Sequence, residues 1–148
     1  MAVSDEQLAL ILQASVDRAC EMLRDDGGFL PFGTQARFNG KIEFLEVDRQ
    51  AEGDTLADLY RQIEAILAEG ARSKEVLAAA LVANTQVAEG SGDGFTNAMA
   101  VLVEAPGFCR SIVVPYRLAD GAVELGAMVP EAVEPALFPV QGQGPAGG

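Results

Sequence analysis

The chain has 148 residues, 49% of them hydrophobic, and this length and composition predict one compact domain with a substantial core. Its 10 basic and 22 acidic residues give a formal net charge of −12, so we expect neither nucleic acid nor a membrane surface as a partner. Histidine is absent, which excludes serine and cysteine triads, histidine-bound metals and the usual general base at neutral pH.

The first predicted element is a helix that begins after Ser4. Ser4 and Gln7 have the spacing of a capping box, in which each side chain accepts a hydrogen bond from the other residue's backbone. Apolar side chains then recur every three or four residues from Leu8 to Leu23, which is typical of an amphipathic helix. Gly27 follows, and a glycine at this position commonly ends a helix.

A β-hairpin is predicted within residues 29–47, because Asn39 and Gly40 favour a tight turn. Pairing Arg37 with Lys41 across a three-residue loop separates apolar from polar side chains, whereas a two-residue loop would mix them. The preferred register places four side chains on one face: Thr34, Ala36, Ile42 and Phe44.

A second helix is predicted from Thr55 to Gly70. Thr55 and Asp58 have cap spacing, and Gly70 follows a clean apolar stripe. Beyond it the pattern changes to period two, which is typical of strands. Turns rich in glycine and proline divide this part into four predicted strands, at residues 77–88, 97–104, 108–118 and 122–129.

The order helix, hairpin, helix, meander predicts an α+β fold. We expect residues 1–139 to form a single domain with an antiparallel sheet of about five to six strands and helices on one face. Residues 140–148 are rich in glycine and polar residues, and we expect a flexible tail there.

No catalytic, cofactor-binding or metal-binding residue is assigned from the sequence. Cys20 and Cys109 lie far apart, without the paired spacing of a zinc or thioredoxin site, so we expect two free, buried thiols and no cofactor. The glycine-rich loop at residues 90–94 joins two predicted strands and carries no lysine, unlike a phosphate-binding loop. Acidic residues are numerous, yet their spacing singles out no catalytic pair.

Three residues of the predicted strand 108–118 are candidates for ligand or partner contact: Arg110, Tyr116 and Arg117. Arg110 alternates in phase with apolar neighbours and should face an apolar layer. Two interpretations stay open. Its aliphatic stem can pass along the sheet edge to water, or its guanidinium can bind an anion or pair with Glu104 across the hairpin.

Three short motifs carry a resemblance: Leu30-Pro31-Phe32-Gly33, Asn39-Gly40 and Pro115-Tyr116-Arg117-Leu118. On these the chain resembles a family of small uncharacterised bacterial α+β proteins across most of residues 4–139. That resemblance implies the fold and no activity, ligand or catalytic residue. The order of elements is also similar to roadblock/longin and profilin-like domains, which are mostly interaction modules, although a strand stands where those folds close with a helix.

The meander is predicted to carry two apolar faces, one including Leu81, Met99 and Val101, the other including Ala80, Ala100 and Val113. Helices on one face leave the second to be covered by another copy. We therefore expect a non-catalytic, cytoplasmic protein-interaction module that acts as a homodimer. The alternative is a small-molecule binding protein or a carboxylate-dependent hydrolase with a site between sheet and helices. The acidic start of the chain and its short apolar runs predict neither a signal peptide nor a membrane span.

Overall fold

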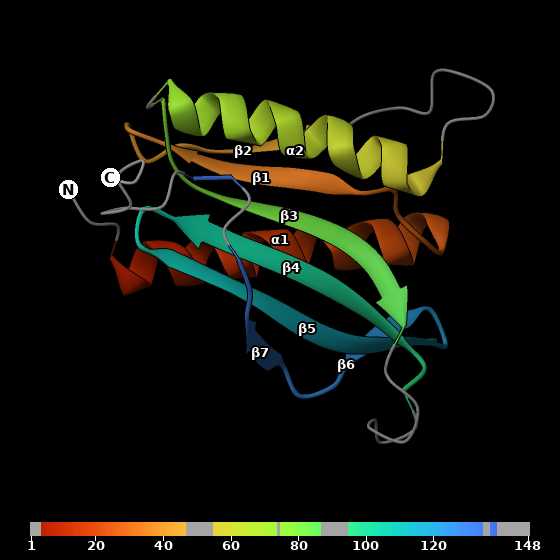
Figure 1. Cartoon of the computed structure of the whole chain (residues 1–148). Coiled ribbons are helices and arrows are strands. Elements are labelled where there is room, and N and C mark those ends of the chain that lie inside the picture. Colours follow the sequence, from red (N-terminus) through yellow and green to blue (C-terminus); the bar gives the residue numbers. More distant parts are fainter. Residues whose placement is uncertain (1–3, 47–54, 74, 87–94, 135–136, 139–148) are drawn as a thin grey trace.

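A computed structural model of the chain describes residues 4–46, 55–73, 75–86, 95–134 and 137–138. These residues form two helices and seven strands (Figure 1). The helices are α1 (Asp5–Asp26) and α2 (Leu56–Arg72). The strands are β1 (Phe32–Arg37), β2 (Ile42–Glu46), β3 (Val76–Gln86), β4 (Asn97–Ala105), β5 (Phe108–Ala119), β6 (Ala122–Leu125) and β7 (Val129–Ala132).

All the strands belong to one antiparallel sheet with the order β2-β1-β3-β4-β5-β6. The strand β7 pairs with β5 beside β6, at the residues that β6 leaves unpaired. The predicted α+β fold with an antiparallel sheet is confirmed. The predicted strand 122–129 is interrupted at Gly126, which packs closely against Phe95 and Pro115. The strand β6 covers residues 122–125, the strand β7 begins only at Val129, and the two pair with successive stretches of β5.

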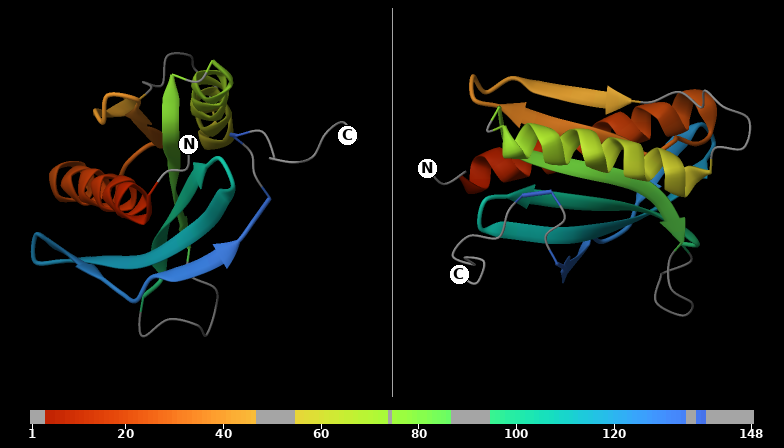
Figure 2. Two further views of the ribbon diagram at one scale, coloured as in Figure 1. Left: turned by 90° about the vertical axis from the view of Figure 1, so that its left-hand side faces the viewer. Right: turned by 45° about the horizontal axis from the view of Figure 1, so that its top comes forward.

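The two helices lie on opposite faces of the sheet (Figure 2), which corrects the prediction of helices on one face. The central strand β3 explains this arrangement because both of its faces are apolar. Ala78, Ala80 and Val82 belong to the core under α1. Ala79 and Leu81, on the other side of the strand, belong to the core under α2. We refer to these as the α1 side and the α2 side of the sheet.

The predicted grouping of residues on the two faces of the meander is wrong for β3. Ala80 pairs with Val103, and Val82 pairs with Val101, so these residues share the α1 side. Leu81 pairs with Leu102 on the α2 side. The prediction placed β3 one residue out of phase because the sequence between the strands does not fix their register.

The helix α1 begins and ends as predicted. Ser4 and Gln7 form the capping box, and Gly27 closes the helix in the left-handed conformation with φ +77°. The buried hydroxyl of Ser15 donates to the Ile11 carbonyl at 2.7 Å and hydrogen bonds to the Thr34 hydroxyl at 2.8 Å. This link fixes α1 over β1 without leaving a buried polar atom unpaired.

The hairpin has the predicted three-residue loop. The Arg37 backbone N–H donates to the Lys41 carbonyl at 2.9 Å, and the Gly40 N–H donates to the Arg37 carbonyl at 2.8 Å. Gly40 has φ +85°, a conformation that favours glycine. Thr34 lies opposite Phe44, as the predicted register requires.

The helix α2 has the predicted cap at Thr55 and continues two residues past Gly70, to Arg72. It approaches the sheet closely at Gly33, where a Cβ atom would lie 2.8 Å from Cγ2 of Ile63 and 3.0 Å from Cδ1 of Leu67. Within the described part of the chain, neither helix is both long and apolar enough to cross a membrane.

Candidate interaction surface

Tyr116, the first candidate contact residue, is built into the fold. Its side chain is buried on the α1 side, and its hydroxyl donates to Oδ1 of Asn84 at 2.5 Å. The amide of Asn84 donates in turn to the Phe29 carbonyl at 3.4 Å. Burial raises the pKa of Tyr116, and the bond to Asn84 partly opposes that shift. Tyr116 therefore ties β5 to β3 and to the segment that precedes β1.

Arg110 lies at the α1 side of β5 with its side chain exposed. The guanidinium carbon lies 5.6 Å from the centre of the Phe108 ring, and Nη1 donates to the Cys109 carbonyl at 2.9 Å. The predicted ion pair with Glu104 is not formed, because Glu104 lies opposite Cys109 and projects to the α2 side. The exposed side chain agrees with the interpretation in which the stem passes to water, and anion binding by Arg110 stays a prediction.

Arg117 projects to the α2 side, opposite to its neighbour Tyr116. Its guanidinium lies over the Phe95 ring, 4.8 Å from the centre, and Nη2 approaches Oε2 of Glu124 at 3.3 Å. Arg110 and Tyr116 share a side, but they are six residues apart on one strand, a separation of about 20 Å. The structure does not bring the three candidate residues together into one site.

Glu104 holds a buried polar site that the sequence analysis did not predict. Its side chain is fully buried on the α2 side. Its carboxylate accepts the backbone N–H of Leu137 at 3.0 Å and that of Phe138 at 3.2 Å. Glu104 occupies a position of β4 at which the alternation predicts a buried apolar side chain. An acidic residue at such a position indicates a buried carboxylate that needs hydrogen-bond donors, and this was the signal available in the sequence. It anchors a chain segment to the sheet.

Cys109 faces Glu104 across the β4–β5 pair. Burial, together with a smaller effect of the nearby Glu104 carboxylate, raises the pKa of its thiol from 9.0 to about 11. Both cysteines are free and buried, as predicted. A thiol with so high a pKa stays protonated at neutral pH and is a poor nucleophile.

Beside this anchor, part of the α2 side lies beyond α2. The helix packs over β1 and β3, and Leu137 and Phe138 cover the adjoining part of the sheet. Further along β4, β5 and β7, four apolar residues are half-buried or exposed, and Val129 is 50% exposed. We call this set the open strip: Ala100, Leu102, Val113 and Val129. Leu102, at the edge of the strip, packs against the core under α2, whereas Ala100, Val113 and Val129 belong to neither described core cluster.

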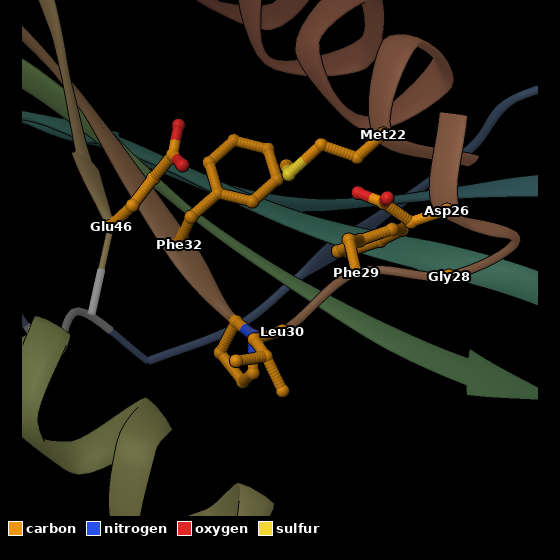
Figure 3. A pocket seen from close by; sticks show the side chains of 8 residues that line it. Met22, Asp26, Gly28, Phe29, Leu30, Phe32 and Glu46 are labelled. Atoms are coloured by element: carbon orange, nitrogen blue, oxygen red, sulfur yellow. The ribbon is translucent and has the colours of Figure 1, made fainter. Parts of the chain in front are cut away.

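A hollow of about 420 Å³ lies where α1 ends and β1 begins (Figure 3). Its lining is Met22, Asp26, Gly28, Phe29, Leu30, Pro31, Phe32 and Glu46. The rings of Phe29 and Phe32 meet edge to face, 5.7 Å apart. The carboxylate of Glu46 is held by Arg18 of α1, at 2.8 Å and 3.1 Å. Because Glu46 is paired and Asp26 is exposed, this hollow offers no desolvated acid for catalysis.

A smaller hollow of about 280 Å³ opens on the other side of the segment before β1. Its walls are Phe29, Pro31, Leu56, Ala57, Tyr60, Arg61, Ala83 and Asn84. Burial raises the pKa of Tyr60. Neither hollow contains any of the three predicted contact residues. Among the described residues, no group of three or more acidic or cysteine side chains is placed to hold a metal ion.

Comparison with known proteins gives no further identification: no family model, no curated protein and no solved structure matches the chain. The resemblance to small bacterial proteins therefore rests on the motif residues alone.

Proposed function

We propose that the protein is a non-catalytic, cytoplasmic interaction module that acts as a homodimer through the α2 side of its sheet. The observation that carries this proposal is the open strip. An apolar surface on β4, β5 and β7 that lies mostly outside both described core clusters favours a protein partner, and a second copy is the commonest one. Two free, buried thiols support a reducing compartment such as the cytoplasm.

Light scattering of the purified protein tests the proposal. At tens of micromolar protein and moderate salt, the expected mass is that of two chains, and a mass of one chain would refute the homodimer. Ala100→Glu and Val113→Glu place a charge in the open strip, so each should give a folded monomer. Ala122→Glu is the matched control, because Ala122 is exposed on β6, away from the strip, and it should leave the dimer intact.

The alternative, small-molecule binding, is favoured by a different observation, the hollow at the end of α1. It combines aromatic and apolar walls with the carboxylates of Asp26 and Glu46, features common in ligand sites. Native mass spectrometry of the freshly purified protein tests it. A bound mass that disappears in Phe29→Ala supports this alternative, and chain masses alone count against it.

A further inference from the structure

The last described residues of the chain are buried on the α2 side of the sheet. Leu137 and Phe138 are 3% and 7% exposed and pack into the core beneath α2. Both backbone N–H groups donate to the carboxylate of Glu104. In Figure 1 these two residues form a short blue stretch near α2, apart from β7. We call β7 together with Leu137 and Phe138 the arm. We call the surroundings of Leu137 and Phe138, which are Glu104 and the core beneath α2, the arm cleft.

The arm cleft binds parts of the arm that any copy of the chain could supply. It binds two consecutive peptide N–H groups through one carboxylate and encloses two adjacent large apolar side chains. A backbone-directed carboxylate flanked by apolar side-chain pockets is a means of binding an extended peptide. The same contacts therefore form whether the arm comes from this chain or from another copy.

The rest of the arm is weakly attached to its own sheet. All four residues of β7 are exposed, and within the described part of the chain β7 pairs with β5 alone. Pro130 lies within β7 and has no N–H to donate to the ladder. Most of the burial that holds the arm is therefore supplied by the arm cleft at its end.

We propose that two copies of the chain exchange arms, so that Leu137 and Phe138 of each copy fill the arm cleft of the other. This inference rests on the proposed homodimer and names how it forms. A stable interface buries about 800 Å² per partner, with about 20 to 30 residues on each side, and the four residues of the open strip fall short of that. Exchange adds β7 and two large apolar side chains. The strip adjoins the arm cleft, because its residue Leu102 packs against the core cluster that contains Leu137 and Phe138.

A mixing experiment with two variants tests the exchange. The donor is Glu104→Leu, which keeps an intact arm and loses the carboxylate of the arm cleft. The acceptor ends at Ala132 and keeps an intact arm cleft without an arm end. If that acceptor fails to fold by circular dichroism, the full-length double variant Leu137→Asp, Phe138→Asp replaces it. Each variant alone should be a monomer, whereas an equimolar mixture should form a one-to-one heterodimer by light scattering.

Adding Phe138→Asp to the donor should abolish that heterodimer, because the donated arm then carries a charge into an apolar cleft. A mixture of folded variants that stays monomeric, beside a dimeric wild type, would overturn the exchange. Variants that each remain dimeric alone would also overturn it, and would show that the open strip suffices for the homodimer. A monomeric wild type would overturn the proposed homodimer itself. The two failures are therefore distinguishable.

Discussion

The carboxylate of Glu104 is fully buried, and its contacts explain how the fold tolerates it. A buried charge is costly unless polar groups surround it. Here the backbone N–H groups of Leu137 and Phe138 point at the carboxylate. The carboxylate gains two hydrogen-bond donors, and the two backbone N–H groups, which are also removed from water, gain an acceptor. The residue is thus a structural anchor rather than a catalytic acid.

We expect Glu104→Ala to lower the free energy of unfolding by about 2 to 4 kcal/mol, since it leaves two buried N–H groups without this acceptor. Glu124→Ala is the control, because its carboxylate forms an exposed ion pair with Arg117 that should contribute less than about 1 kcal/mol. Urea denaturation of both variants measures the difference. Equal losses would show that Glu104 does not anchor the arm.

A second residue-scale prediction concerns pH. Burial raises the pKa of Cys109 from 9.0 to about 11, so the folded state holds this proton more tightly than the unfolded state. The corresponding stability is fully present below about pH 9 and is lost as the pH rises towards about 11. Burial shifts the pKa of Tyr60 and Tyr116 in the same direction, which extends the loss at higher pH.

Urea denaturation at several alkaline pH values should show this loss. Cys109→Ala should reduce the slope of the free energy of unfolding against pH by an amount that corresponds to at most about one proton. Alkylation gives an independent measurement. Iodoacetamide at pH 8 should label Cys109 slowly in the folded protein and rapidly in urea. Rapid labelling of the folded protein would mean that the thiol is neither buried nor protonated.

At the scale of elements, the approach of α2 to the sheet depends on Gly33. Gly33→Ala places a methyl group 2.8 Å from Cγ2 of Ile63, so we expect a loss of about 1 to 3 kcal/mol in the free energy of unfolding. Gly28→Ala is the matched control, because its added Cβ meets no atom within 4 Å; its change should stay within about 0.5 kcal/mol. Thermal or urea denaturation compares the two.

Elements with local signals were predictable from the sequence. The two capping boxes and the Asn39-Gly40 turn depend on residues at most a few positions apart, and all three are found as predicted. The side of the sheet that each helix covers was not predictable in this way. It depends on the phase of β3 relative to β4, which are joined by a long connection.

Elements and contacts that depend on segments far apart in the chain were missed, because no local pattern fixes how such segments meet. The strand β7 pairs with β5, and the anchor at Glu104 binds Leu137 and Phe138. No local sequence pattern indicates either contact. One of the two interpretations of Arg110 paired it with Glu104, because the two residues are close in the β4–β5 hairpin. Their register sends the two side chains to opposite sides.

The end of the chain offers a further prediction at this scale. Residues 140–148 lie outside the described residues, so the predicted flexible tail is argued from composition alone. Removing them should change the melting temperature by about 1 to 2 °C at most, because a glycine-rich sequence has few side chains to bury. Removing residues 133–148 also deletes Leu137 and Phe138 and should lower it by several degrees. Differential scanning calorimetry measures both, and equal effects would contradict the role of the arm.

For the whole molecule, the charge opposes the proposed homodimer. Each copy carries a net charge of −12, and two copies repel each other at low ionic strength. Raising the salt from about 50 mM to about 500 mM screens this repulsion, so the dimer should tighten several-fold. Analytical ultracentrifugation across the salt series measures the change. A dimer that weakens with salt would indicate an interface held by ion pairs rather than by the apolar strip.

The position of β3 has a consequence for the chain before it folds. Residues 76–82 are free of charge and proline and almost wholly buried, with a strand on each edge and a helix on each face. Such a segment is prone to form intermolecular β-structure when it is exposed. With an isoelectric point of about 4.2, nascent and unfolded chains repel one another at neutral pH. The acidic composition thereby protects the synthesis of a protein whose central strand would otherwise drive its aggregation.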